Sequence, residues 1–376
     1  MRRFKVTTAL VAALMISVLP HLAASSAQPA TVHPQVLQAR LDDLVRSAFV
    51  PGGQLVVTAD GDATQINSGV GDLATGAPFP DDAQVRIASN TKTFVATVVL
   101  QLVGEGRVEL DAPVERYLPG VVRGPGGDGN LITVRNLLQH TSGIPDYLLR
   151  LDWGSVEALQ RYQTPDQLIR LGLDMPALFA PGSRFSYSNT NYLLAGKLIE
   201  QVTGRPLGVE VTSRILVPLD LQDTYWPAFP QENVIRGPHP RAYQIFNGAQ
   251  VDITDIDPGW GLADGALVST DADLNRFFTA LLSGKLLRPT ELAEMQHTIQ
   301  GADPALPDDV GLGLYHRTNA CGIDIWSHGG AMDGFFVFGG YTPARSITVS
   351  LNQVPPLFGL GYKGAMDNLV DAAFCG

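Results

Sequence analysis

The spacing of apolar residues predicts strands near both ends of the chain and helices between them. Near the N-terminal end, Gly52–Ala59 and Gln65–Val70 have the composition of two strands joined by a turn. From residue 89 to about residue 230, most segments have helical character and are broken by Gly/Pro loops. The strand pattern returns in four closely spaced runs: Gly311–His316, Gly322–Ser327, Phe335–Tyr341 and Ile347–Leu351.

Amphipathic helices are predicted outside these strands at both ends. The first runs from about Gln35 to Phe49, and the last carries its apolar residues at Met366, Leu369, Val370, Ala373 and Phe374. Because closely spaced strands with short turns form antiparallel sheets, the expected fold class is α+β. The sheet would be built from about residues 28–88 and 260–376 and flanked by the two terminal helices. An all-helical lobe of about residues 89–259 would be inserted between them.

The first 27 residues have the features of an export signal. Basic residues at positions 2, 3 and 5 precede the short apolar run Val6–Leu19, and Ser25 and Ala27 suit cleavage after Ala27. The apolar run is short for a bilayer span. We therefore expect a secreted or periplasmic protein, residues 28–376, with no stable membrane anchor.

The charge balance argues against several classes of partner. The chain carries 37 acidic and 26 basic residues, a formal net charge of −11. Phosphate binding needs a basic surface, so nucleic acid is not an expected partner, and anionic lipid is not attracted either. The seven histidines show no paired ligand spacing, so no metal site or other cofactor is expected.

The chain contains two cysteines, Cys321 and Cys375, both in its last sixth. In an oxidising compartment a single pair of cysteines usually forms a disulfide. On the chain-entropy model this bond would stabilise the fold by about 4 kcal/mol. Two free buried thiols are the alternative.

The tetrad Ser89-Asn90-Thr91-Lys92 directly precedes a strongly periodic helix. Residues three apart on a helix share a face, so Lys92 would lie beside Ser89 and could activate its hydroxyl. A helix N-terminus also disfavours a protonated lysine and favours a developing oxyanion. Taken alone, however, S-x-x-K is common by chance, and a solvated serine near a lysine is the ordinary interpretation.

Three later segments of the chain strengthen the catalytic interpretation of that tetrad. They are the Leu137–Pro145 loop with His140, the run Tyr187-Ser188-Asn189, and His328-Gly329-Gly330. Each has an ordinary explanation: His140 could order a loop, Tyr187 could pack its ring, and Asn189 could cap a helix. These explanations do not account for the order of the motifs along the chain.

In this order the motifs resemble the serine penicillin-recognising family, which includes DD-carboxypeptidases, class C β-lactamases and related esterases. Tyr187-Ser188-Asn189 matches the Y-x-N variant of the second motif, and His328-Gly329-Gly330 stands where K-T-G or H-x-G is usual. The resemblance covers roughly Val36 to the C-terminus. The cysteines on either side of the third motif resemble those of the secreted DD-carboxypeptidases in particular.

The resemblance implies a serine acyl-enzyme. Ser89 would attack a carbonyl, and either Lys92 or Tyr187 would act as the base. The backbone N–H groups of Ser89 and Ala331 would form the oxyanion hole.

The resemblance also implies a set of substrate-binding residues. Asn189 would orient the substrate amide, and His328 would supply a polar or positive rim that titrates near pH 6 to 7. Gly329 and Gly330 would let the substrate backbone approach the strand. Trp260 would line the cleft.

Two positions depart from relatives that trim D-Ala-D-Ala. Those enzymes hold the terminal carboxylate with a hydroxyl, here replaced by Gly329, and with an arginine, whose expected position is occupied here by Tyr315. Arg317 would face the same side as Tyr315 on a regular strand and could substitute.

We expect a D-alanyl-D-alanine carboxypeptidase on peptidoglycan stem peptides, acting as a monomer and inhibited covalently by β-lactams. The alternative is an esterase or D-amino-acid amidase of the same fold. A class C-type β-lactamase and a non-catalytic binder of cell-wall peptides are less favoured.

Overall fold

The computed structural model of the chain describes residues 33–152, 154–228, 230–255, 262–300, 308–332, 334–355 and 362–375. The predicted export signal (residues 1–27) and Trp260 lie outside these ranges. None of the helices in the described ranges is both long and apolar enough to cross a bilayer.

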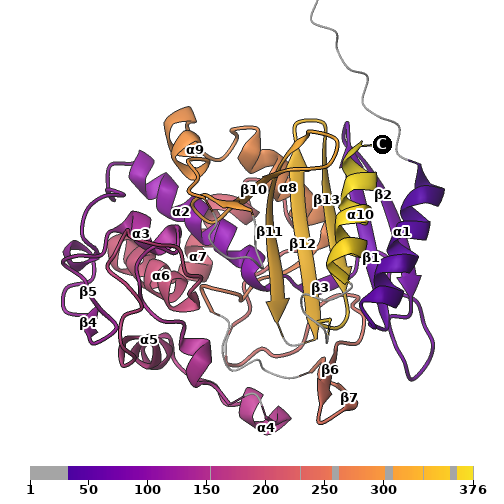
Figure 1. The fold of residues 1–376 in the computed structure, drawn as a ribbon, viewed down its shortest axis with the longest axis horizontal. Coiled ribbons are helices and arrows are strands. Elements are labelled where there is room, and N and C mark those ends of the chain that lie inside the picture. The colour runs from indigo at the N-terminus through magenta and orange to yellow at the C-terminus, as the bar shows by residue number, and fades with distance from the viewer. Residues whose placement is uncertain are drawn as a thin grey trace, which may run out of the picture.

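A seven-stranded antiparallel sheet forms the centre of the molecule (Figure 1). Its strand order is β2-β1-β13-β12-β11-β10-β9. The N-terminal hairpin β1–β2 is joined to the C-terminal strands because Gly53 on β1 is paired with Leu351 on β13. The strands are β1 (Gly52–Ala59), β2 (Asp62–Gly69), β9 (Asp309–Val310), β10 (Tyr315–Thr318), β11 (Asp324–Met332), β12 (Phe335–Thr342) and β13 (Arg345–Leu351).

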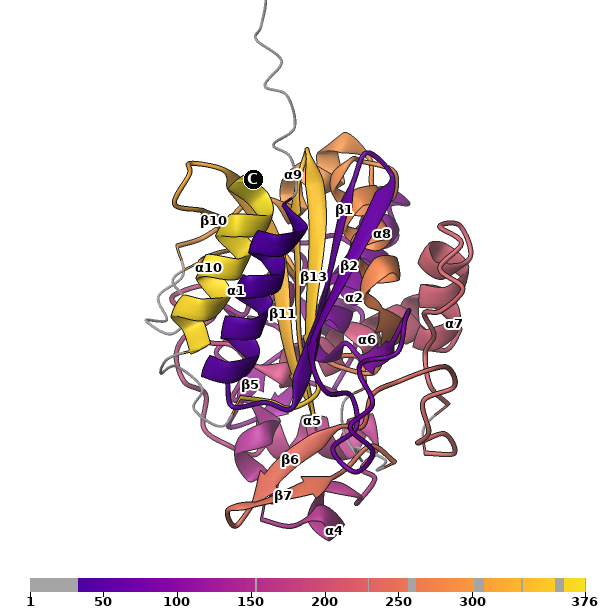
Figure 2. The same cartoon turned by 90° about the vertical axis from the view of Figure 1, so that its right-hand side faces the viewer.

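Helices cover both faces of this sheet. On one face, α1 (Pro34–Ser47) and α10 (Tyr362–Cys375) lie side by side, as Figure 2 shows. On the other face, α8 (Asp271–Leu282) packs against β1, β12 and β13. The expected α+β class, with an antiparallel sheet flanked by the terminal helices, is confirmed.

The remaining helices lie to one side of the sheet (Figure 1). They are α2 (Thr91–Gly104), α3 (Val134–Leu138), α4 (Val156–Leu159), α5 (Pro165–Leu173), α6 (Asn189–Thr203), α7 (Leu207–Val211) and α9 (Pro289–Met295). Shorter helical turns are η1 (Ala88–Asn90), η2 (Val114–Arg116), η3 (Tyr147–Arg150) and η4 (Thr212–Leu216).

Two short hairpins interrupt the region that was expected to be all-helical. They are formed by β4 (Arg123–Gly124) with β5 (Gly127–Asp128), and by β6 (Tyr243–Phe246) with β7 (Ala249–Asp252). A further pair, β3 (Gln84–Arg86) with β8 (Val268–Thr270), lies at the boundary between this region and the sheet. The pairing of β3 with β8 brings the chain to the position where η1 begins.

The strand predicted over Gly311–His316 is displaced in the structure. Strand β10 begins at Tyr315, and the preceding residues form a loop that docks on α2, where Thr93 Oγ1 donates to Gly313 O at 2.8 Å. Gly313 has φ +73°, a left-handed conformation that interrupts strand geometry. The sequence prediction was therefore wrong by about four residues at the start of this strand.

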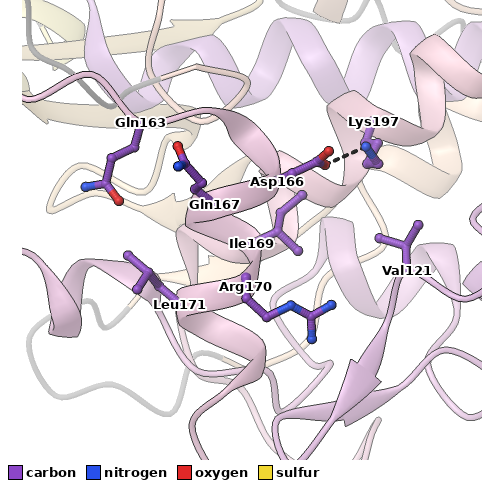
Figure 3. Close-up of a pocket in the computed structure, with 8 residues that line it drawn as sticks. All are labelled: Val121, Gln163, Asp166, Gln167, Ile169, Arg170, Leu171 and Lys197. Atoms are coloured by element: carbon purple, nitrogen blue, oxygen red, sulfur yellow. Dashed lines mark hydrogen bonds and ion pairs between the residues drawn. The ribbon is translucent and has the colours of Figure 1, made fainter.

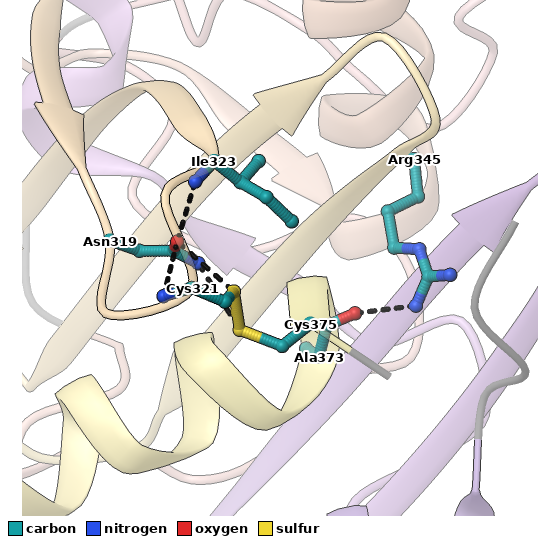
Figure 4. The surroundings of a disulfide bond; sticks show 6 residues. All are labelled: Asn319, Cys321, Ile323, Arg345, Ala373 and Cys375. Atoms are coloured by element: carbon teal, nitrogen blue, oxygen red, sulfur yellow. Dashed lines mark hydrogen bonds between the residues drawn. A yellow bond between two sulfur atoms is a disulfide. The ribbon is translucent and has the colours of Figure 1, made fainter. Parts of the chain in front are cut away.

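A disulfide joins Cys321, in the turn between β10 and β11, to Cys375 at the end of α10 (Figure 4). The Asn319 side chain orders this turn, because its Oδ1 accepts from Cys321 N at 3.1 Å and from Ile323 N at 2.9 Å. The expected pairing of the two cysteines is thus present, and it ties the last helix to the turn that leads into β11, the strand that carries the third motif.

Candidate active site

Ser89 lies in the short helical turn η1, directly before α2. The preceding residue, Ala88, has φ +47°, which is uncommon for a residue with a side chain and marks a strained turn. The turn is fixed to the sheet by Asn90, whose Nδ2 donates to Ile87 O at 3.0 Å and to Val337 O on β12 at 3.2 Å. Ser89 itself is partly exposed, so its hydroxyl is accessible from outside.

Lys92 is fully buried and makes three hydrogen bonds with its amino group. Its Nζ lies 2.8 Å from Ser89 Oγ, 2.7 Å from Asn189 Oδ1 and 2.7 Å from Asp264 O. An ammonium can donate to all three, whereas a neutral amine has two N–H bonds and one lone pair. Because the amide oxygen and the carbonyl can only accept, the lone pair of neutral Lys92 must face the Ser89 hydroxyl.

The pKa of Lys92 is suited to this role. Burial lowers it from its usual 10.5 to about 8, although the charges of Asp264 and Asp146 act in the opposite direction. The neutral amine is therefore accessible near neutral pH, and proton transfer from Ser89 to Lys92 is geometrically direct.

Two acidic residues that sequence reasoning missed complete the surroundings of Lys92. Asp146 Oδ2 accepts from Asn189 Nδ2 at 2.8 Å, which fixes the orientation of the Asn189 amide that holds Lys92. Asp264 Oδ2 accepts from Tyr147 Oη at 2.8 Å, which holds the loop whose carbonyl binds Lys92. The only sequence signal was the position of Asp146 and Tyr147, directly after the Leu137–Pro145 loop.

Tyr187 approaches the same hydroxyl from the other side. Its Oη lies 3.0 Å from Ser89 Oγ, and Lys92 Nζ lies 5.0 Å from the centre of its ring. Burial raises the pKa of Tyr187 well above its usual value, so the phenol is protonated at neutral pH. In this state Tyr187 donates to Ser89 Oγ, while Ser89 donates to neutral Lys92. The geometry thus favours Lys92 as the base and Tyr187 as the acid that protonates a leaving group.

His328 of the third motif is buried on β11, with its ring centre 5.1 Å from that of Tyr315. Burial, together with the charge of Lys92, lowers the pKa of His328 to about 3. The expectation of a positive rim that titrates near pH 6 to 7 was therefore wrong, because the imidazole is neutral throughout that range.

The two glycines of the third motif lie next to the nucleophile. A Cβ at Gly330 would lie 2.4 Å from Ile87 O and 2.9 Å from Ser89 N, so no larger residue fits there. The pairing of β10 with β11 ends at Tyr315 and Ser327, so this pairing does not cover the edge of β11 from His328 onward. Ala331 is exposed on that stretch. The oxyanion hole formed by Ser89 N and Ala331 N stays a prediction.

The structure brings Ser89, Lys92, Tyr187 and Asn189 into one hydrogen-bonded group but does not join Arg317 to it. Arg317 Nη1 instead forms an ion pair with Asp367 Oδ1 of α10 at 2.7 Å. Its expected role in holding a substrate carboxylate stays a prediction. Trp260 lies outside the described residues. No cluster of three or more His, Cys, Asp or Glu side chains suited to a metal occurs in the ranges described.

A groove of about 670 Å³ on the outer side of α5 is separate from this group (Figure 3). Lys197 and Asp166, which form an ion pair 2.5 Å long, are part of its lining. Val121, Gln163, Gln167, Ile169, Arg170 and Leu171 complete its lining. None of these residues belongs to the Ser89 group.

Comparisons with known proteins agree with the geometry. The family model described as Beta-lactamase matches residues 37–358. The D-stereospecific amidohydrolase from Streptomyces sp. superposes with a TM-score of 0.82 and 36% identity, covering 92% of this chain and 99% of that one. The D-amino acid amidase from Ochrobactrum anthropi SV3, complexed with L-phenylalanine amide, gives a TM-score of 0.78 and 28% identity over 90% of this chain and 97% of that one.

A relative matched by sequence is Esterase EstB from Burkholderia gladioli, 35% identical over 197 residues, which are 50% of this chain and 50% of that protein. The chain spans half the length or less of the first curated relatives it matches.

Proposed function

We propose that this chain, a serine hydrolase that belongs to the beta-lactamase family, cleaves amides of D-amino acids through an acyl-enzyme on Ser89. Attack by Ser89 Oγ on the amide carbonyl, with its proton passing to Lys92, gives a tetrahedral adduct. Collapse of the adduct forms the ester bond and releases the amine, which takes a proton from Tyr187. Water then attacks the ester and gives a proton to the Tyr187 phenolate, while Lys92 returns its proton to the departing Ser89 oxygen, so one amide and one water give one carboxylic acid and one amine, or ammonia from a primary amide.

The main support for this proposal is that the third motif offers no charged group to a substrate carboxylate. A carboxypeptidase must hold the terminal carboxylate of its substrate, which requires a cation or several donors. Here His328 is uncharged, Gly329 has no hydroxyl, and the guanidinium of Arg317 is already paired with Asp367. A substrate whose leaving group is an uncharged amine or alcohol avoids the cost of an unpaired carboxylate.

The acids near Lys92 point to the same class of substrate. Asp146 and Asp264 lie close enough to Lys92 to influence its pKa, and neither is paired with an arginine in the described part of the chain. An additional carboxylate in this site would be repelled, whereas a neutral or cationic substrate would not.

The relatives support the amidase over the carboxypeptidase that the motifs first suggested. The Streptomyces amidohydrolase matches this chain over nearly the full length of both proteins. Esterase EstB matches half of it, so turnover of short esters by the same Ser89 group is an expected side activity.

Hydrolysis of D-phenylalanine amide and D-alanine amide, compared with the L-enantiomers, tests the proposal. We expect turnover of the D-amides, a clear preference over the L-forms, and complete loss in Ser89→Ala. Equal rates on both enantiomers, or no turnover of any amide by an enzyme that cleaves p-nitrophenyl acetate, would overturn it.

The carboxypeptidase remains the second candidate because the first two motifs suit it equally well. Release of D-alanine from a diacyl-D-Ala-D-Ala peptide, at a rate exceeding that on D-alanine amide, would decide in its favour. A second experiment, labelling with fluorescent penicillin, reports whether β-lactams acylate Ser89. The label should be absent from the Ser89→Ala variant if they do. The rate at which the label disappears then separates inhibition from β-lactamase turnover.

A further inference from the structure

His140 contacts the Tyr187 segment at three points, although no hydrogen bond joins it to Ser89 among the described residues. The backbone oxygen of His140 accepts from Ser186 N at 2.9 Å, and its Nδ1 accepts from Ser188 N at 3.2 Å. Its ring lies against the ring of Tyr187, with centres 4.3 Å apart and planes inclined by 28°. The residues on either side of Tyr187 are therefore both held by one histidine, which also supports the ring between them.

The backbone conformation of His140 makes this arrangement possible. His140 has φ +56°, in the left-handed region that a few residue types, histidine and asparagine among them, adopt more readily than others. This conformation directs both the carbonyl and the side chain of His140 toward the Tyr187 segment. The ordinary interpretation, a histidine that merely orders its own loop, does not explain why both groups reach the same three residues.

The imidazole is fixed in the protonation state that this contact needs. Because Nδ1 accepts a hydrogen bond, the ring carries its proton on Nε2 and is neutral. Burial, and after it the charge of Lys92, lowers the pKa of His140 well below its usual value. The Nδ1 acceptor is therefore retained at neutral pH.

We propose that His140 is the positioning residue for Tyr187, holding the phenol O–H against Ser89 Oγ in the geometry that proton transfer to the leaving group requires. The proposal rests on the Ser89 acyl-enzyme described above, but it does not depend on which amide or ester is the substrate. It predicts that changes at His140 act on the rate of acylation through Tyr187 and not on substrate binding.

Two variants that keep the left-handed backbone separate the contacts. His140→Gly removes the ring and the acceptor, whereas His140→Asn keeps an acceptor near the Nδ1 position and loses the stacked ring. With an alkyl ester such as ethyl butyrate as substrate, whose alkoxide leaving group must be protonated as it departs, we expect His140→Gly to lower kcat by about 100-fold with KM nearly unchanged, since a displacement of about 1 Å can cost this much. His140→Asn should recover part of the loss.

Thr133→Ala is the matched control. Thr133 caps α3, the helix that leads into His140, and its Oγ1 accepts from Asn136 N at 3.2 Å. Its removal loosens the same helix without touching Tyr187. We expect Thr133→Ala to lower the melting temperature while leaving kcat unchanged.

The decisive test repeats both His140 variants in a Tyr187→Phe background. If His140 acts through the phenol, its variants add little to the loss caused by Tyr187→Phe. Independent, multiplicative losses would overturn the proposal.

A crystal structure of His140→Gly tests the proposal without an activity measurement. In this variant Tyr187 Oη should lie beyond hydrogen-bond distance of Ser89 Oγ, and an unmoved phenol would refute the role. Failure of the amide proposal affects neither measurement.

Discussion

Gly329 and Gly330 are consecutive residues of β11, yet a side chain would meet open space at Gly329 and a backbone collision at Gly330. An added Cβ at Gly329 has no neighbour within 4 Å, whereas at Gly330 it would lie 2.4 Å from Ile87 O. The first glycine thus leaves room for a group that faces a substrate, and the second allows the strand to approach the nucleophile.

Gly329→Ser should therefore be tolerated and should change specificity. The new hydroxyl would stand where carboxypeptidases donate to a terminal carboxylate, so we expect the ratio of D-Ala-D-Ala cleavage to D-amide cleavage to rise about tenfold, the effect of one hydrogen bond to a charged group. Kinetics on both substrates provide the measurement. Gly330→Ala is the control, because it should abolish both activities, and an unaltered ratio in Gly329→Ser would contradict the assignment.

Activity should rise with pH through an apparent pKa of about 8. Only neutral Lys92 can accept the Ser89 proton, and burial places its pKa at about 8. A profile of kcat/KM against pH reports this value for the free enzyme. No inflection is expected between pH 6 and 7, because His328 is neutral there; an inflection in that range that disappears in His328→Asn would be inconsistent with its buried position.

Asp146→Asn should shift that profile toward lower pH. The carboxylate of Asp146 raises the pKa of Lys92 electrostatically, so its neutralisation removes a favourable partner of the ammonium. The asparagine oxygen can still accept from Asn189 Nδ2, which preserves the position of the amide. A midpoint that moves to higher pH, or does not move, would show that Asp146 does not influence the base.

Asp271→Asn should stabilise the protein at neutral and alkaline pH. Burial raises the pKa of Asp271 from 3.8 to about 7, and its Oδ2 has no hydrogen-bond partner among the described residues. A raised carboxyl pKa destabilises the folded state progressively as pH rises from about 4 to 7, by up to about 4 kcal/mol, and by a constant amount above that. Urea denaturation at pH 4 and pH 8 measures this effect. The free energy of unfolding of Asp271→Asn, relative to that of the wild type, should be higher at pH 8 than at pH 4. An equal effect at both pH values would refute the burial argument.

Replacement of both Cys321 and Cys375 by serine should lower the stability of the fold and leave the catalytic rate unchanged. The disulfide closes an interval of 54 residues, for which the chain-entropy model gives about 4 kcal/mol. Thermal denaturation of the double variant, compared with the wild type under reducing and non-reducing conditions, measures the loss. A double variant as stable as the oxidised wild type would contradict the estimate.

The spacing of the motifs predicted the centre of the site well because its geometry is local. Ser89 and Lys92 are three residues apart at a helix start, so their contact follows from helix periodicity alone. Tyr187 and Asn189 could be placed only by their order relative to that pair. Asp146 and Asp264 gave no comparable signal, because they meet Lys92 only through the tertiary fold.

Charge state was the part that the sequence could not reveal. The pattern identified His328 as a site residue but not its neutrality, which depends on burial beside Tyr315 and Lys92. The start of β10 was missed for a similar reason, since Gly313 is bound to α2 by a contact that crosses 220 residues of chain.

The pairing of β1 with β13 also determines when, during protein synthesis, the enzyme can become active. Gly52 N donates to the side chain of Asn352, 300 residues later, so the middle of the sheet cannot close while the ribosome still holds the C-terminal strands. Contacts of such long range also form slowly. Ser89 is translated long before Asn352, but the sheet that supports it closes only after β13 has left the ribosome.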